Sequence, residues 1–132
     1  FDGWQAYVNT KLMNVLFSHL LAGRLAGSGL VSNALCPGLI DTNFFHTNAI
    51  FAGGGYERLK PAMRSPAAGA MLPLYLAADP AAEGINGAFY VRQGRDGRRA
   101  VALDWDQTAA AELWAQSRAA VERWLMPASR PC

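Results

Sequence analysis

A tyrosine and a lysine, Tyr7 and Lys11, stand four residues apart near the start of the chain. On a helix this spacing places both side chains on one face, a turn apart. A tyrosine hydroxyl has an unperturbed pKa of about 10, and a nearby cation stabilises its phenolate form. The pair therefore suits general acid–base chemistry at a carbonyl or an alcohol. Lysine fits this role better than arginine, because its compact ammonium also reaches ligand hydroxyls.

The helix predicted to carry this pair runs from Gln5 to about Leu25. It contains no proline, and its single glycine, Gly23, lies near its end. Apolar side chains occupy several of its sides, as expected for a helix buried between layers or against a partner. This helix is therefore also a candidate surface for homo-oligomer formation. Its apolar residues are Val8, Leu12, Met13, Val15, Leu16, Phe17, Leu20 and Leu21.

A second group of candidate residues follows a short predicted strand, Leu30 to Cys36. Pro37 and Gly38 end this strand abruptly, and Thr42 offers a hydroxyl a few residues later. Ligands bind at the carboxyl ends of strands in open α/β sheets, and glycine lets backbone approach a flat ring closely. This turn is therefore a predicted ligand site.

The remaining elements continue an alternation of helix and strand. Residues 39–65 are predicted to be irregular, with one or two short helices and three successive glycines at 53–55. Ser65 caps a helix from Pro66 to about Ala78, and a second strand covers 88–92. A last helix begins near Asp106. Its predicted apolar stripe contains Trp114, Ser117, Val121, Trp124 and Leu125.

This order indicates a parallel α/β sheet. Two predicted strands are too few for three helices, because parallel sheets are covered on both faces. The chain also begins with Phe1 rather than methionine. We therefore expect a piece of a longer protein.

The composition excludes several other classes. A chain of 132 residues suits one domain, and 52% hydrophobic against 17% charged residues indicates a globular protein. The net charge of +2 predicts no nucleic-acid partner, and the basic run at 95–99 is expected to be a solvated turn. No apolar run reaches the roughly 18–20 residues of a membrane span.

The cysteines and histidines predict neither a disulfide nor a metal site. Cys36 and Cys132 give no disulfide framework, so we expect a reducing compartment, the cytoplasm. His19 and His46 stand alone, without the spacing of metal ligands.

Taken together, the motifs resemble the C-terminal half of a short-chain dehydrogenase/reductase, and within that family the retinol-dehydrogenase-like branch. The resemblance implies that residues 1–132 are the catalytic and substrate portion of one doubly wound, Rossmann-like domain that lacks its N-terminal, dinucleotide-binding half. The matching segments are Tyr7-Val8-Asn9-Thr10-Lys11, Val31 to Gly38, Ile40, Thr42, Ser65-Pro66, Gly69-Ala70, Leu74 to Ala77, Gly84, Gly87, Tyr90, Leu113-Trp114 and Ser117.

The resemblance also implies roles for individual residues. Tyr7 would be the catalytic acid/base, and Lys11 would hold the nicotinamide ribose of NAD or NADP and assist the tyrosine. Pro37, Gly38 and Ile40 would line the nicotinamide, with Ile40 contacting its carboxamide through backbone. Thr42 would bond the carboxamide or the pyrophosphate. The implied cofactor-binding set is thus Tyr7, Lys11, Pro37, Gly38, Ile40 and Thr42.

The substrate implied is a small apolar carbonyl or alcohol, and Phe44, Phe45 and Phe51 are its candidate contacts. These three rings suit either a lipophilic substrate wall or plain anchors for the loop. Residues 43–64 would then be either a lid over the substrate or a loop packed permanently on the domain.

The chain also departs from the family's pattern. The Gly-rich dinucleotide turn, the Asn-Ala-Gly strand end and the catalytic serine of the family precede the tyrosine and have no counterpart here. Cys36 stands where the branch often has histidine. Two alternatives to an oxidoreductase are therefore kept: a non-catalytic relative that binds lipid or another protein, and an epimerase or dehydratase that uses the same pair.

Overall fold

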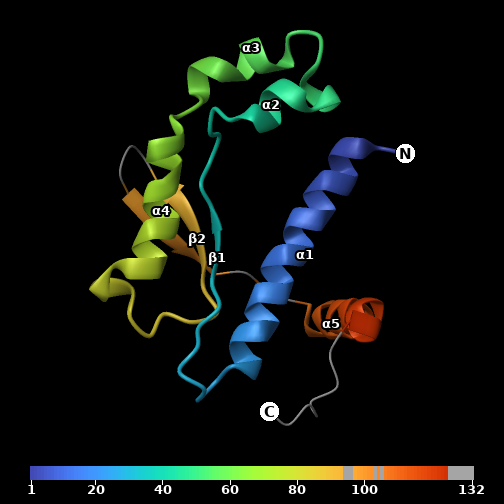
Figure 1. Ribbon diagram of the computed structural model, residues 1–132, viewed down its shortest axis with the longest axis vertical. Coiled ribbons are helices and arrows are strands. Elements are labelled where there is room, and N and C mark those ends of the chain that lie inside the picture. The colour runs from blue at the N-terminus through green and yellow to red at the C-terminus, as the bar shows by residue number, and fades with distance from the viewer. Residues whose placement is uncertain (94–96, 103, 105, 125–132) are drawn as a thin grey trace.

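In the computed structural model the described residues are 1–93, 97–102, 104 and 106–124. Within these residues there are five helices and three strands, arranged as Figure 1 shows, with single 3-10 turns at 49–51, 60–62, 80–82 and 122–124. The elements are α1 (Gly3–Arg24), β1 (Ala34–Cys36), α2 (Asn43–Thr47), α3 (Gly55–Leu59), α4 (Pro66–Ala78), β2 (Phe89–Gln93), β3 (Gly97–Val101) and α5 (Gln107–Val121).

The sheet is mixed and has three strands in the order β1-β2-β3. β1 pairs with β2 in parallel, with Leu35 opposite Tyr90, as the alternation of helix and strand predicts. β2 then pairs with β3 in antiparallel register, with Val91 opposite Arg99. The prediction of an α/β fold is confirmed, whereas the prediction of only two strands is wrong.

The third strand was missed because it lies in the basic run that was predicted to be a solvated turn. Gly97, Arg98 and Arg99 belong to β3, while residues 95 and 96 of the run lie outside the described residues. Glycine is among the residues depleted in strands, so propensity argues against this one. At Gly97, however, a Cβ would lie 2.6 Å from the carbonyl oxygen of Gln93, so the close strand approach itself requires glycine.

The helices α1 and α4 lie on either side of the strands (Figure 1). Alternate residues of a strand face opposite sides, so Tyr90 and Arg92 share one face of β2. That face meets α4: the Tyr90 ring is 6.3 Å from the Tyr75 ring, and Arg92 Nη1 donates a 2.6 Å hydrogen bond to the Ala68 carbonyl. The other face of the sheet is left to α1.

Two polar contacts fix the C-terminal half of α1 to the loops that enter the strands. Ser18 Oγ lies 2.9 Å from Ser32 Oγ, and His19 Nδ1 lies 3.2 Å from the carbonyl oxygen of Gly87. Because α1 runs opposite to β1, its N-terminal half projects toward the carboxyl end of that strand (Figure 1). The fold therefore carries the Tyr7–Lys11 turn to the edge where the ligand site is predicted.

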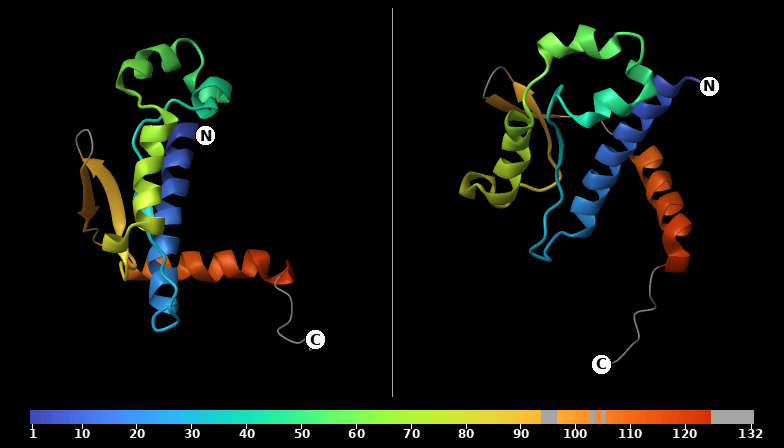
Figure 2. Two further views of the ribbon diagram at one scale, coloured as in Figure 1. Left: turned by 60° about the vertical axis from the view of Figure 1, so that its left-hand side comes forward. Right: turned by 45° about the horizontal axis from the view of Figure 1, so that its top comes forward.

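The last helix packs across α1. Asp106 caps α5 by accepting hydrogen bonds from the backbone N–H groups of Thr108 and Ala109. Trp114 stacks on Phe17 at 5.0 Å, and Figure 2 shows the two helices crossing. The predicted apolar stripe is confirmed for Trp114, Ser117 and Val121, which line a hollow together with Phe17. Trp124 lies in the 3-10 turn after the helix, and residue 125 lies outside the described part of the chain.

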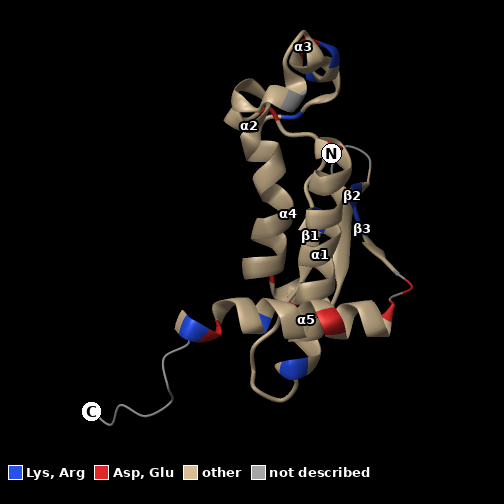
Figure 3. Cartoon of the chain, turned by 90° about the vertical axis from the view of Figure 1, so that its right-hand side faces the viewer, with Lys and Arg blue, Asp and Glu red and all other residues tan. Residues whose placement is uncertain are grey.

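Much of α1 is open to solvent although its sequence is apolar. Leu12 is 53% exposed and Met13 46% exposed, and only Ala22 of this helix is buried. Figure 3 shows how few charges α1 and α4 carry. Within the described residues no helix has the length and hydropathy needed to cross a bilayer. The exposed side of α1 is an apolar surface of the kind that usually meets another protein surface.

Asn33 offers a test of how the parallel strand pair is held. Its Nδ2 donates to the Ile85 carbonyl at 2.7 Å, and its Oδ1 accepts from the Ala88 N–H at 3.0 Å. Asn33→Ala leaves two half-buried backbone groups without these partners, so we expect the free energy of unfolding to fall by about 1–3 kcal/mol. Urea denaturation of the whole protein measures it.

The matched control is Asn9→Ala, which removes only the exposed contact between Gln5 Nε2 and Asn9 Oδ1. This substitution should change the free energy of unfolding by no more than about 0.5 kcal/mol. Equal losses in the two variants would show that Asn33 does not hold the strand pair.

Candidate functional site

The structure places Tyr7 and Lys11 on the same side of the first turns of α1. Asp2 caps this helix by accepting hydrogen bonds from the N–H groups of Trp4 and Gln5. Lys11 Nζ lies 5.2 Å from the centroid of the Tyr7 ring, within the range of a cation–π contact. Lys11 is also the only charged residue of α1 before Arg24. The one cationic side chain of α1 before Arg24 therefore lies against the Tyr7 ring.

An aromatic cluster surrounds the tyrosine. The Tyr7 ring lies 5.6 Å from the Trp4 ring and 5.7 Å from the Phe44 ring of α2. Phe44 in turn contacts Phe45 at 5.2 Å and Phe51 at 5.6 Å. Of the three phenylalanines predicted to contact substrate, Phe44 thus lies beside Tyr7 and the other two pack against Phe44, although all three come from a different part of the chain. Trp4 was not predicted, although its spacing of three residues from Tyr7 on a helix is a readable signal.

The segment after β1 is held by a short parallel bridge between Ile40 and Arg64. The Arg64 N–H donates to the Leu39 carbonyl, and the Asp41 N–H donates to the Arg64 carbonyl, each at 2.9 Å. In this bonding pattern the N–H and C=O of Ile40 itself point to the opposite edge of the segment. They are therefore directed away from Arg64, as a backbone contact to a ligand requires.

The side chain of Ile40 packs against α4 at Gly69, which is buried. A Cβ built on Gly69 would lie 2.9 Å from Ile40 Cγ1, closer than carbon atoms can approach without displacement. The turn before it is open, because Gly38 adopts a left-handed φ of +88° and a Cβ there would meet nothing within 4 Å. The predicted nicotinamide segment is thus anchored on one side and accessible on the other.

Asp41 joins the two short helices α2 and α3, a feature that the sequence did not reveal. Tyr56 Oη donates to Asp41 Oδ1 at 3.0 Å, and His46 Nε2 lies 3.6 Å from the same oxygen. Burial first, and then the hydrogen bond and negative charge of Asp41, raise the pKa of Tyr56, while Lys60 opposes them. Asp41 and Tyr56 are fifteen residues apart across irregular structure, so no periodicity could have paired them.

No protein-family model matches the chain. Individual proteins do: the chain is 34% identical over 124 residues to dehydrogenase/reductase SDR family member 13 of Bos taurus, covering 88% of the chain and 32% of that protein. Polyprenol dehydrogenase of Danio rerio is 35% identical over 121 residues, 88% of the chain and 36% of its own length. Retinol dehydrogenase 14 of Mus musculus is 32% identical over 111 residues, covering 82% of the chain and 33% of that protein.

These matches cover most of the chain and agree with each other. The chain belongs to the short-chain dehydrogenase/reductase family. Within that family the chain is related to the retinol-dehydrogenase-like members, as the motifs predicted. The chain spans about a third of the length of the curated relatives that it matches.

Short-chain dehydrogenases/reductases generally use NAD(P). Several groups of this chain are candidates to hold the nicotinamide end of that cofactor. The Ile40 backbone offers a donor and an acceptor, which a carboxamide needs. Thr42 occupies the N-cap position of α2 without a side-chain capping bond, so its hydroxyl is not used there. Lys11 adds an exposed ammonium. The roles of Pro37, Gly38, Ile40 and Thr42 nevertheless remain predictions.

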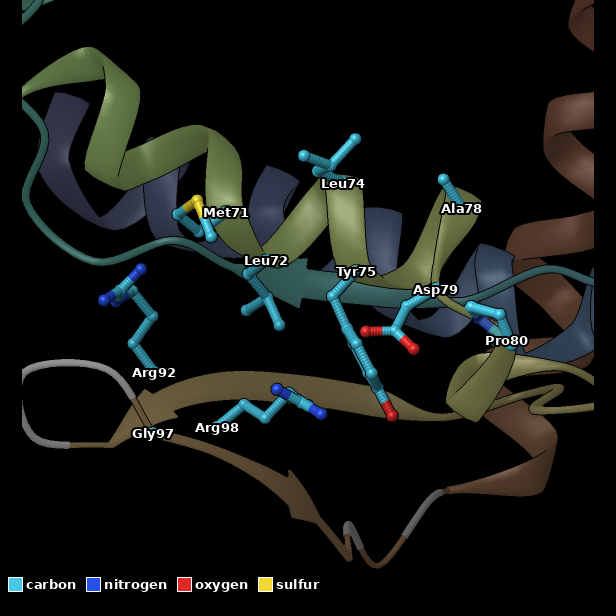
Figure 4. Close-up of a pocket in the computed structure, with 10 residues that line it drawn as sticks. All are labelled: Met71, Leu72, Leu74, Tyr75, Ala78, Asp79, Pro80, Arg92, Gly97 and Arg98. Atoms are coloured by element: carbon cyan, nitrogen blue, oxygen red, sulfur yellow. The ribbon is translucent and has the colours of Figure 1, made fainter.

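A hollow of about 500 Å³ lies away from this site, between α4 and the paired strands β2 and β3 (Figure 4). It is larger than the hollow beside Phe17. The guanidinium of Arg98 lies 3.4 Å from the Tyr75 ring in the larger hollow, and the Tyr75 hydroxyl donates to the Ala81 carbonyl. This is the face of the sheet opposite to α1, so the hollow is not part of the Tyr7 site. Within the described residues, no three His, Cys, Asp or Glu side chains gather as metal ligands.

Gly69→Ala tests whether α4 positions the segment after β1. The added methyl must displace Ile40, and overpacking of this kind costs about 1–3 kcal/mol of unfolding free energy. Thermal and urea denaturation of the whole protein measure the loss. In an Ile40→Ala background the methyl has space, so the same substitution should cost much less.

Gly23→Ala is the control, because it makes the same chemical change in a helix where a Cβ meets nothing within 4 Å. It should stabilise the protein by roughly 0.5–1 kcal/mol, the difference between glycine and alanine in a helix. An equal cost of Gly69→Ala with and without Ile40 would contradict the packing described.

Proposed function

We propose that the whole protein is an NAD(P)-dependent oxidoreductase that interconverts a carbonyl and an alcohol. This chain would supply its acid–base and substrate-binding portion. The observation that carries the proposal is the turn of α1 on which the Lys11 ammonium lies 5.2 Å from the Tyr7 ring while Phe44 lies 5.7 Å from it on α2. An ionisable hydroxyl, a cation and an apolar wall are thereby brought to one place.

In the reducing direction, the Tyr7 hydroxyl would donate its proton to the carbonyl oxygen. Lys11 would stabilise the phenolate that remains, because its positive charge is one helical turn away. In the oxidising direction the phenolate would accept the proton of the alcohol. The dinucleotide, when bound, supplies or accepts the hydride. The residues proposed to hold its nicotinamide end are Lys11, Pro37, Gly38, Ile40 and Thr42.

The substrate proposed is apolar. Phe44, Phe45 and Phe51 pack against one another next to Tyr7, and Phe44 is 38% exposed. An apolar ligand would remove this exposed aromatic surface from water, which favours binding. Two relatives are named for alcohols, retinol and polyprenol, which supports the same substrate class.

Removal of the Tyr7 hydroxyl should abolish most of the activity. In the whole protein, Tyr7→Phe is expected to lower kcat for reduction of decanal by roughly 10²–10⁴ through loss of proton transfer, with little change in melting temperature. Lys11→Arg should also impair turnover, because a planar guanidinium does not replace a compact ammonium. Absorbance of NADPH and NADH at saturating aldehyde follows the reaction.

Tyr75→Phe is the matched control, since it removes a tyrosine hydroxyl on the opposite face of the sheet. It should leave turnover within about twofold, because none of the contacts described for Tyr75 links it to the site. Near-normal turnover by Tyr7→Phe would remove this tyrosine from the mechanism and favour the non-catalytic alternative.

A second expectation concerns the isolated 132-residue chain. The pyrophosphate of a dinucleotide binds at a Gly-rich turn and helix N-terminus in this fold, and no such motif occurs in the sequence. Isothermal titration with NADH and with NADPH should therefore detect no micromolar binding to the chain alone. Micromolar affinity would show that the groups around Lys11 and Thr42 hold the cofactor without a Gly-rich turn.

A further inference from the structure

Residues 41–64 form a loop whose two ends are tied together. The bridge between Ile40 and Arg64 closes its neck with the two backbone hydrogen bonds already described. Between these ends lie α2 and α3, each of only five residues. Such short helices are unstable by themselves in water, so contacts outside them must hold them in place.

Hydrophobic burial around these two helices is only partial. Neither α2 nor α3 contains a buried residue. The two are joined through Gly53 and Gly54, whose φ angles of +67° and +84° lie in the left-handed region that glycine adopts freely. Among the described residues, side-chain contacts are therefore needed to set the position of α3 relative to α2.

Asp41 is at the centre of these contacts. Its Oδ1 accepts the 3.0 Å hydrogen bond from the Tyr56 hydroxyl of α3 and lies 3.6 Å from His46 Nε2 of α2. The rings of His46 and Tyr56 are also in contact, with centroids 4.2 Å apart, and Lys60 Nζ lies 5.3 Å from the Tyr56 ring. One carboxylate thus connects both helices to the segment that follows β1.

The aromatic rings of the site belong to α2 and to the 3-10 turn that follows it. Phe44 and Phe45 precede His46 by two residues and one residue on α2, and Phe44 contacts Tyr7. Phe51 lies in the 3-10 turn between α2 and α3. Asp41 and Tyr56 are therefore separated from the rings of the site by only a few residues of backbone.

We propose that Asp41 and Tyr56 are positioning residues for the substrate site: their hydrogen bond holds α2 and α3 together so that Phe44, Phe45 and Phe51 form one wall beside Tyr7. The role in catalysis rests on the function proposed above, whereas the role in ordering the loop does not. The residues would act on the apolar part of the substrate and not on the proton transfer.

The state of the Tyr56 hydroxyl agrees with a donor role. Burial and Asp41 raise its pKa above the ordinary tyrosine value, so it keeps its proton throughout the neutral range. Asp41 remains available as the acceptor, because the backbone bridge uses its N–H and leaves its side chain free for Tyr56 and His46.

Tyr56→Phe tests the proposal, because it deletes one oxygen and keeps the ring. In the whole protein we expect KM for decanal to rise roughly 3–10-fold, the value of one hydrogen bond, with kcat changed by less than twofold. KM for propanal, which has little apolar surface to place against the wall, should change by less than twofold. In hydrogen exchange without ligand, the amides of 43–60 should exchange several-fold faster, while β1 and β2 keep their protection.

Asp41→Ala should reproduce the loss for decanal, and the double variant with Tyr56→Phe should be no worse than Asp41→Ala, since both remove the same bond. Asp41→Asn keeps an acceptor oxygen and should restore most of the wild-type KM. Tyr75→Phe again serves as the control for loss of a tyrosine hydroxyl.

Unchanged exchange at 43–60 and unchanged KM for decanal in Tyr56→Phe would overturn the proposal. Equal rises in KM for decanal and propanal, with a lower melting temperature, would also overturn it, because they indicate general destabilisation. If the wild-type protein reduces no aldehyde with either dinucleotide, the proposed function fails. The exchange comparison still decides whether the hydrogen bond orders the loop.

Discussion

The bridge between Ile40 and Arg64 is the constraint on which the rest of this site depends. Two backbone hydrogen bonds fix the chain just after it leaves β1, and Gly69 allows α4 to pack directly against the Ile40 side chain. With both ends of the following loop held at one place, the intervening residues have a restricted space to occupy. That space lies over the N-terminal turns of α1, where Tyr7 is.

The helices could be predicted well because their ends are encoded locally. Asp106 caps α5, and Ser65 caps α4 by accepting from the Ala68 N–H, with Pro66 in the first turn. The parallel pair of strands also followed from the alternation of helix and strand. β3 did not, since its antiparallel pairing depends on a close approach at Gly97 that only the folded sheet reveals.

The site was predictable to a similar extent. Tyr7 and Lys11 are one helical turn apart, so their proximity follows from the helix itself. The contact between Phe44 and Tyr7, by contrast, joins α2 to α1, which are separated in the sequence by a strand and a turn. From the sequence, the three phenylalanines could be either a substrate wall or anchors for the loop. The connection of Asp41 to Tyr56 was not foreseen, because no local spacing encodes it. Side-chain contacts within a regular helix could be predicted from the sequence, whereas contacts made by a long irregular loop could not.

The position of β3 has a consequence for how the sheet can grow. Its five residues pair along the full length of β2, so that β2 offers no free edge on this side. The outer edge that β3 itself presents carries Arg98 and Arg99, and charged side chains on an edge strand oppose pairing with a strand of another molecule. β1, at the other end of the order, has only three residues and no charge. Any strand added to this sheet by the whole protein is therefore expected beside β1, next to the helix that carries Tyr7, and addition beside the basic strand β3 is disfavoured.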